Sequence, residues 1–357
     1  MYRAHVSTSG GYISGEVKLA ITLRMMAGGD ALDLGALFDI SSSYCRDIFN
    51  YVLEYWIVKP NLGGMDIKAY LSNHNEMKRV SNGFARRSNG VLTGAIGAID
   101  GWLVKIVRPS YRVDKIKNVV GFFSRKGFYA LNVQCMVDHD KKVLWASFNN
   151  RGCSHDSSVF RNTMLYETLK DKSSDLYLRK FFILGDSAYA IESFIIPPYD
   201  SPGKCTPEDD FNFYHSSARI TVECAFGEID LRWGLFWKRL TSSVNNSILS
   251  CEGAMHIHNF LVDYRLKNSV PVADITHERE IFVDDMSDNG IFNMVITNDN
   301  NRGEGGRPSN EEKRRRMNGV SLRDELKTAL MNANMHRRRK KDNWNYDSSN
   351  HITDDNY

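Results

Sequence analysis

The hydrophobic pattern divides the chain into four parts. Between residues 16 and 60, apolar positions recur every three or four residues, which predicts three short helices. Residues 61–90 continue as a helical connector. Residues 91–268 contain alternating apolar runs such as "YALNVQCMV", a buried run "FFIL" and two long amphipathic helices. We therefore expect a mixed α/β sheet flanked by helices, after an N-terminal helical domain over residues 1–60.

The N-terminal helical domain has the pattern of a helix-turn-helix, because a short "FDIS" turn separates its last two helices. Ser41 is placed to cap the third helix, whose predicted buried positions are Ile48, Val52 and Tyr55 or Trp56. In this interpretation the third helix contacts DNA, through Ser42, Ser43, Tyr44 and Arg46. A small helical bundle that only packs on the next domain is the alternative.

After residue 269 the apolar density falls, and residues 269–357 are predicted to be a mostly disordered charged tail, with "SLRDELKTALMNANM" as a candidate short helix. Residues 302–341 contain thirteen Lys and Arg against five Asp and Glu, so the tail is basic and could attract an anionic partner. Its clusters "KRRR" and "HRRRKK" are similar to a bipartite nuclear address, which predicts a nuclear and cytoplasmic protein. Solvated surface charge without a partner is the alternative.

Composition excludes several other classes. Apolar residues make up 42% of the chain, which is typical of a globular protein. The six cysteines are scattered and form no CxxC pair, so we expect neither a disulfide framework nor a zinc site. No run approaches the roughly 20 apolar residues of a membrane helix, so we expect no membrane partner.

Three acidic residues lie where acids are costly to bury. Asp100 ends the apolar run "GAIGAID", and Asp186 ends "FFILGD". Glu223 lies at the margin of a helical apolar stripe, with Gly227 leaving space one turn later. If the three converge, their charges repel unless a cation is present. Mg²⁺ or Mn²⁺ would suit such carboxylates, and two such ions can promote hydrolysis of a phosphodiester bond.

The motifs "GAIGAIDG", "RKGFYALNVQ", "SHDSSVF", "FFILGDSAY", "FNFYHSSARITVECAFG" and "IHNF" occur in this order. Together they resemble the conserved blocks of the PIF/Harbinger DDE transposases and the nucleases derived from them. The resemblance implies an RNase H-like fold, DNA as the substrate, and a metal-binding catalytic triad at Asp100, Asp186 and Glu223. Asp156, in "SHDS", is a candidate fourth metal ligand, and an acid that favours its helix dipole is the alternative.

The same resemblance places three cations near the triad. Arg125, Lys126 and Arg219 are predicted phosphate contacts, with plain surface charge as the alternative for each. Trp102 and Leu103 depart from the residues that usually follow the first aspartate of the family. These departures put DNA positioning and turnover in doubt but remove no acid.

Two functions follow from these patterns. The first is a metal-dependent DNA endonuclease or transposase that acts on transposon ends or target DNA. The second is a catalytically inactive, domesticated transposase that binds DNA and regulates. The resemblance also leaves room for a separate Myb-like DNA-binding partner and for a homo-oligomer.

Overall fold

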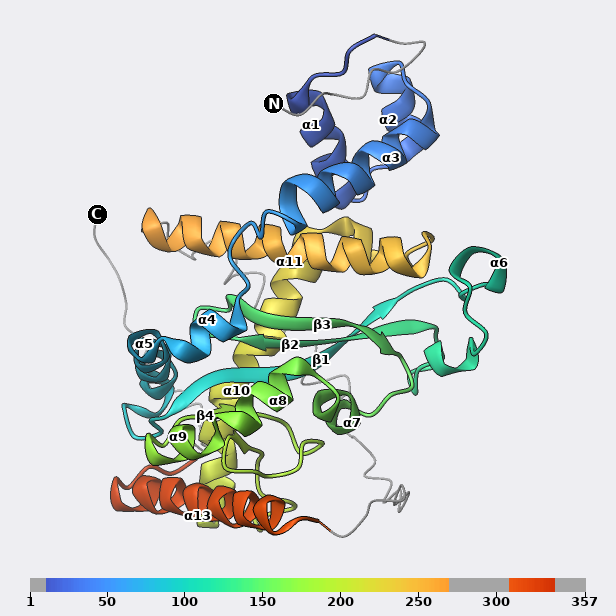
Figure 1. Ribbon diagram of the computed structural model, residues 1–357. Coiled ribbons are helices and arrows are strands. Elements are labelled where there is room, and N and C mark those ends of the chain that lie inside the picture. The colour runs from blue at the N-terminus through green and yellow to red at the C-terminus, as the bar shows by residue number, and fades with distance from the viewer. Residues whose placement is uncertain (1–10, 270–307, 338–357) are drawn as a thin grey trace, which may run out of the picture.

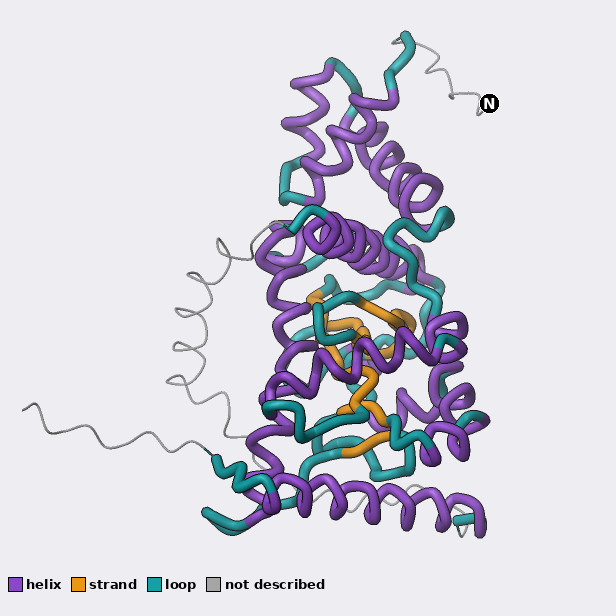
Figure 2. The backbone as a smooth tube through the Cα atoms, turned by 90° about the vertical axis from the view of Figure 1, so that its left-hand side faces the viewer, coloured by secondary structure: helices purple, strands orange, loops and turns teal. Residues whose placement is uncertain are grey.

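The computed structural model describes residues 11–269 and 308–337 (Figure 1). Three N-terminal helices lie at one end of the molecule, and a long helix separates them from the sheet. A second long helix covers the opposite end, so the elements form successive layers (Figure 2). Within the described ranges, no helix combines the length and apolar character needed to cross a bilayer.

The N-terminal unit consists of α1 (Gly15–Met26), α2 (Ala31–Phe38) and α3 (Ser42–Val52), as predicted. The Ser41 side chain caps α3 by accepting a hydrogen bond from the Tyr44 N–H. The helix then continues as a π-helix, η1 (Leu53–Val58), which shifts its register. As a result Leu53 and Ile57 are buried, and the prediction that Tyr55 or Trp56 would be buried is wrong.

The predicted mixed sheet is confirmed. Its five strands have the spatial order β3-β2-β1-β4-β5. Their bounds are β1 (Ala95–Lys105), β2 (Ala130–Val137), β3 (Val143–Arg151), β4 (Phe182–Leu184) and β5 (Ile195–Ile196). The pairs β1–β2 and β2–β3 are antiparallel, whereas the pairs β1–β4 and β4–β5 are parallel. The sheet and its flanking helices are consistent with an RNase H-like fold.

Helices surround this sheet. They are α4 (Ile67–Ser72), α5 (His74–Ala85), η2 (Arg86–Ser88), α6 (Tyr111–Asp114), η3 (Val120–Phe122), α7 (Asp156–Arg161), α8 (Met164–Asp171), α9 (Ser173–Leu178), α10 (Pro207–Arg232), η4 (Gly234–Trp237) and α11 (Val244–Lys267). The Trp102 ring stacks on Phe226 of α10, with ring centroids 5.8 Å apart. Alternation along β1 therefore directs Asp100 and Trp102 to the α10 face and Gly101 to the opposite face.

The C-terminal helix α13 (Asn310–Asn332) lies within residues 269–357, which were predicted to be a mostly disordered tail, so at least this part of the tail is folded. α13 packs on α10 and β5, and it buries Leu322, Leu326 and Leu330. The Arg315 side chain, within the "KRRR" cluster, is buried and pairs with the buried Glu192 carboxylate at 2.8 Å. The remaining tail residues, 270–307 and 338–357, lie outside the described part of the chain.

Backbone contact at Gly319 explains how closely this helix docks. A Cβ atom at Gly319 would lie 2.6 Å from the Glu192 backbone, so only glycine allows this approach. The charged composition of this segment alone therefore did not indicate that α13 packs as part of the fold.

Candidate active site

Asp100 and Asp186 lie side by side on neighbouring strands. β4 pairs in parallel with β1 through Ala98 and Leu184, so Asp100 and Asp186 each follow that pair by two residues. The Gly101 N–H donates to Asp100 Oδ1 at 2.7 Å, and the Ala188 N–H donates to Asp186 Oδ1 at 3.0 Å. Backbone donors therefore orient both carboxylates at one edge of β1.

Glu223 reaches the same place from α10, which crosses the sheet on the Asp100 side. Its side chain is about one-third exposed, and a Cβ added at Gly227 would meet nothing within 4 Å. The expected open space beside Glu223 is therefore present.

Arg219, one helical turn before Glu223, joins two of the three acids. Its guanidinium donates to Asp100 Oδ2 at 2.7 Å and to Glu223 Oε1. The Arg219 side chain is only 15% exposed, so this cation faces the acids rather than solvent. Arg219 is therefore an internal counter-ion in this structure, and its predicted contact to a DNA phosphate stays a prediction.

Burial and neighbouring charges shift the pKa values of Asp100, Asp186 and Arg219. Burial raises the pKa of Asp100 to about 7, helped by Asp186 and Glu223 and opposed by Arg219. Burial also raises the pKa of Asp186. Burial lowers the pKa of Arg219, but the carboxylates of Asp100 and Glu223 outweigh it, and the pKa is raised overall. The three acids and Arg219 thus form one electrostatically coupled group.

Asp156 lies on the opposite face of β1, at the start of α7. Its Oδ1 accepts a hydrogen bond from Asn132 Nδ2 at 2.8 Å, and Gln134 Nε2 donates to its backbone carbonyl at 2.7 Å. A Cβ at Gly101 would lie 2.7 Å from the same carboxylate oxygen, so glycine permits the contact. The structure therefore holds Asp156 next to the strand that carries Asp100, and its charge helps burial to raise the pKa of Asp186, so its role as a fourth metal ligand stays a prediction.

Asn132, Gln134 and Gly101 are site residues that the sequence reasoning missed. A usable signal was present, since Asn132 and Gln134 are amides at alternating positions of an otherwise apolar and fully buried strand. Such polar groups need hydrogen-bond partners, and here the partner is the start of α7.

The chemistry of Asp100, Asp186 and Glu223 suits Mg²⁺ or Mn²⁺, because all three donate carboxylate oxygens to a common region that already holds a cationic group. A divalent ion and the Arg219 guanidinium would compete for the same oxygens. Among the described residues, Asp100, Asp186 and Glu223 are not a group whose ligand atoms all lie within 4.8 Å of one another.

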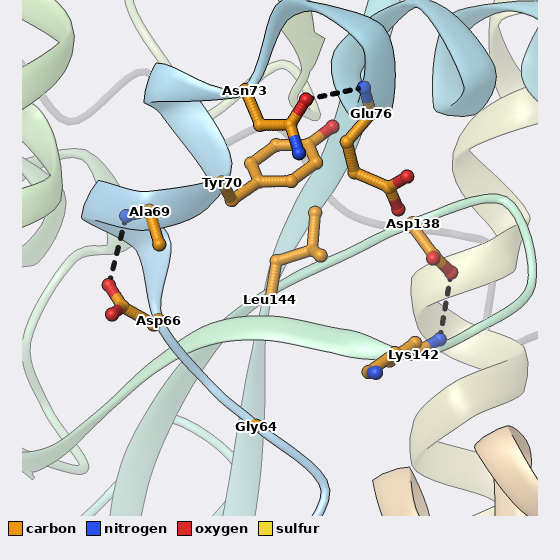
Figure 3. A pocket seen from close by; sticks show the side chains of 9 residues that line it. All are labelled: Gly64, Asp66, Ala69, Tyr70, Asn73, Glu76, Asp138, Lys142 and Leu144. Atoms are coloured by element: carbon orange, nitrogen blue, oxygen red, sulfur yellow. Dashed lines mark hydrogen bonds between the residues drawn. The ribbon is translucent and has the colours of Figure 1, made fainter.

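Across residues 11–269 and 308–337, the acidic group whose ligand atoms do lie within 4.8 Å of one another is Asp138, His139 and Asp140. Arg79 donates to Asp140 Oδ2 at 3.1 Å and lies 3.4 Å from Asp138 Oδ2. Figure 3 shows Asp138 in a pocket beside Glu76, where the Lys142 N–H also binds it. Arg79 and backbone N–H groups therefore already bind the two carboxylates, which explains the cluster as part of the structure of this turn.

The predicted DNA-contacting residues lie in three places. Arg125 and Lys126 are exposed in the connection between β1 and β2. On α3, Ser43 and Arg46 are exposed, whereas Ser42 and Tyr44 are half-buried. Residues 11–60 carry six acids against four Lys and Arg, so this unit offers little positive charge to a phosphate backbone.

Comparison with known proteins supports the geometry. Residues 99–259 match the family described as DDE superfamily endonuclease. The chain is also 24% identical over 273 residues to "Protein ALP1-like" of Arabidopsis thaliana, and the match covers 72% of this chain. The match spans 63% of that relative's length. No solved structure matches. The matched segment contains Asp100, Asp186 and Glu223, and both matches confirm the predicted resemblance to the PIF/Harbinger transposases.

Proposed function

We propose that this protein is a transposase-derived DNA endonuclease that hydrolyses phosphodiester bonds with Mg²⁺ or Mn²⁺. The observation that carries the proposal is the gathering of Asp100, Asp186 and Glu223 around one cationic group. When bound, the divalent ions would stabilise the attacking and leaving oxygens of the scissile phosphate. The three carboxylates are the residues that would hold them.

The chain's own residues have defined tasks in this proposal. Backbone N–H groups fix the orientation of Asp100 and Asp186 before any ion arrives. While no ion is bound, Arg219 pairs with Asp100 and Glu223 and so reduces the repulsion between their carboxylates in this half-buried site. The open space at Gly227 leaves room beside Glu223 for a substrate phosphate.

The test is nicking of supercoiled plasmid DNA by the purified full-length chain with Mg²⁺ or Mn²⁺. Asp186→Asn keeps an oxygen for the Ala188 N–H but loses the charge, so we expect the rate to fall about 100-fold or more, equivalent to about 2.7 kcal/mol. The matched control is Asp171→Asn, at an exposed acid on α8, which should nick at the wild-type rate. Equal nicking by Asp186→Asn and wild type would contradict the assignment.

A second candidate function, a catalytically inactive DNA-binding protein, is favoured by one observation. Arg219 already occupies the cationic position between Asp100 and Glu223. Divalent-independent DNA binding, with no nicked product under any metal condition, would identify this alternative.

The proposal extends to partners and location. DNA at transposon ends or target sites is the proposed substrate, and a Myb-like partner and a homo-oligomer are proposals of the same kind. Nuclear localisation is proposed from the basic clusters at 313–316 and 336–341. In the docked helix Arg315 is buried, so the first cluster would present only its other residues.

A further inference from the structure

Residues 106–129, which connect β1 to β2, project beyond the end of the sheet. Figure 1 shows their helix α6 at the far right of the molecule, opposite α4 and α5. This segment contains six Lys and Arg against a single acid. We propose that it is a basic arm that binds the phosphate backbone of duplex DNA and holds the duplex against the acidic site; the proposal rests on the proposed endonuclease function.

The cations of the basic arm are all available to a ligand. All six are exposed, and none forms an ion pair within the described residues: Arg108, Arg112, Lys115, Lys117, Arg125 and Lys126. Elsewhere on the surface many cations are paired, for example Arg179 with Asp175 and Lys180 with Glu325. An unpaired group of this size is expected where a polyanion binds.

The arm's single acid does not oppose this charge. Asp114 Oδ2 accepts from the Ser110 N–H, and its Oδ1 accepts from the Val244 N–H, both at 2.8 Å. This carboxylate therefore anchors the arm to the start of α11 rather than facing the ligand. The outer surface is left with positive charge only.

The basic arm is also anchored before any ligand binds. The Val107 N–H donates to the Leu240 carbonyl at 2.9 Å, and the Cys153 N–H donates to the Gly121 carbonyl at 3.1 Å. Between these anchors lies a depression of about 600 Å³ whose lining includes Arg108, Tyr111 and Lys117. A preorganised surface loses less entropy on binding than a mobile loop does.

The arm and the acidic site are close. Arg125 lies near enough to Asp186 for the two charges to interact. Ile106 follows Asp100 by six residues, about 20 Å along an extended strand. A duplex bound along the arm would therefore place phosphates near the three carboxylates.

The test is equilibrium binding of a fluorescent 30-base-pair DNA duplex to the full-length chain in EDTA, over a range of NaCl concentrations. The arm variant is Arg108→Gln, Arg112→Gln and Lys117→Gln, whose side chains make no hydrogen bond within the described residues. The matched control removes three exposed, unpaired cations near α4 and α5: Lys68→Gln, Lys78→Gln and Arg87→Gln.

For the arm variant we expect the slope of log affinity against log salt to fall by up to about 2.7, at about 0.9 per lost phosphate contact. The affinity in 0.1 M salt should fall tenfold or more, and the control should keep the wild-type slope. An unchanged arm-variant slope, or an equal change in the control, would overturn the proposal. Tighter binding to an RNA duplex of the same length would overturn the assignment to DNA.

This measurement separates the arm from the endonuclease. A reduced slope in the arm variant, together with no nicking by the wild type, supports the arm and contradicts the endonuclease. Nicking by the wild type with an unchanged slope in the arm variant contradicts the arm alone.

Discussion

Replacing Arg219 by glutamine tests whether the acidic site needs an internal cation. The guanidinium bonds both Asp100 and Glu223, and glutamine removes its charge while keeping a polar side chain. Asp186 lies beside these groups and adds to the repulsion that the variant would leave uncompensated. We expect the free energy of unfolding to fall in the absence of divalent ions.

The exposed fractions of the side chains set the size of this loss. Removing one partner from a fully buried ion pair costs about 3–5 kcal/mol, whereas an exposed pair contributes about 1 kcal/mol or less. Side-chain exposures of 15% for Arg219, 19% for Asp100 and 32% for Glu223 lie between these limits. We therefore expect a loss of about 2 kcal/mol, and about half of that for Arg219→Lys, which keeps the charge but not the planar fork.

The assay is urea unfolding followed by tryptophan fluorescence, with and without Mn²⁺. Because the ion replaces the missing charge, Mn²⁺ should stabilise Arg219→Gln more than it stabilises the wild type. At a Mn²⁺ concentration of 100 times the variant's dissociation constant, the variant should gain about 2.7 kcal/mol of unfolding free energy. Arg179→Gln, which breaks an exposed pair, is the control and should lose at most about 1 kcal/mol and respond to Mn²⁺ as the wild type does. The reasoning is refuted if Arg219→Gln is as stable as the wild type, or if Mn²⁺ stabilises both equally.

Three further predictions concern other parts of the fold. Arg315→Met should weaken α13 docking by about 3–5 kcal/mol, because it leaves the buried Glu192 carboxylate without its ion-pair partner. Hydrogen exchange of the α13 backbone should therefore accelerate, and unchanged protection would count against this prediction. Burial lowers the pKa of His215 to about 4, so the unfolded chain binds its proton first and stability falls as pH drops from 6.5 to 4. His215→Gln should remove up to about 3 kcal/mol of that pH dependence in urea unfolding; identical pH profiles would contradict it. Gly101→Ala should destabilise the protein by about 1–3 kcal/mol in the same assay, because the added methyl group would meet the Asp156 carboxylate. Gly227→Ala should stabilise the protein by up to about 1 kcal/mol, because the added methyl group meets nothing within 4 Å and alanine favours the helix.

Regular periodicity made most of the fold predictable. Alternation in "YALNVQCMV" identified β2, and Ser41 identified the start of α3, because each signal lies within a few neighbouring residues. The π-helical register of η1 was not predictable, since it arises where Leu53 and Ile57 pack on α11.

The full extent and docking of helix α13 were not predictable for a different reason. Its charged composition favoured disorder, but Leu322, Leu326 and Leu330 recur every four residues and form one narrow apolar face. Its two most specific contacts, Arg315 with Glu192 and Gly319 with the same residue's backbone, join positions more than 120 residues apart. No local pattern reports such a partner.

The acidic site shows the same division between local signals and distant partners. Apolar runs ending in Asp100 and Asp186 could be recognised, but nothing in the sequence states which anion a nearby cation will face. Arg219 and Glu223 are four residues apart on a helix, a spacing that itself favours an ion pair, so half of the counter-ion arrangement was available from spacing. The other half, the bond to Asp100, closes a separation of 119 residues. Because Arg219 binds Asp100 and Glu223, we expect the attraction of DNA to come from cations without internal partners, such as the six in the arm between β1 and β2.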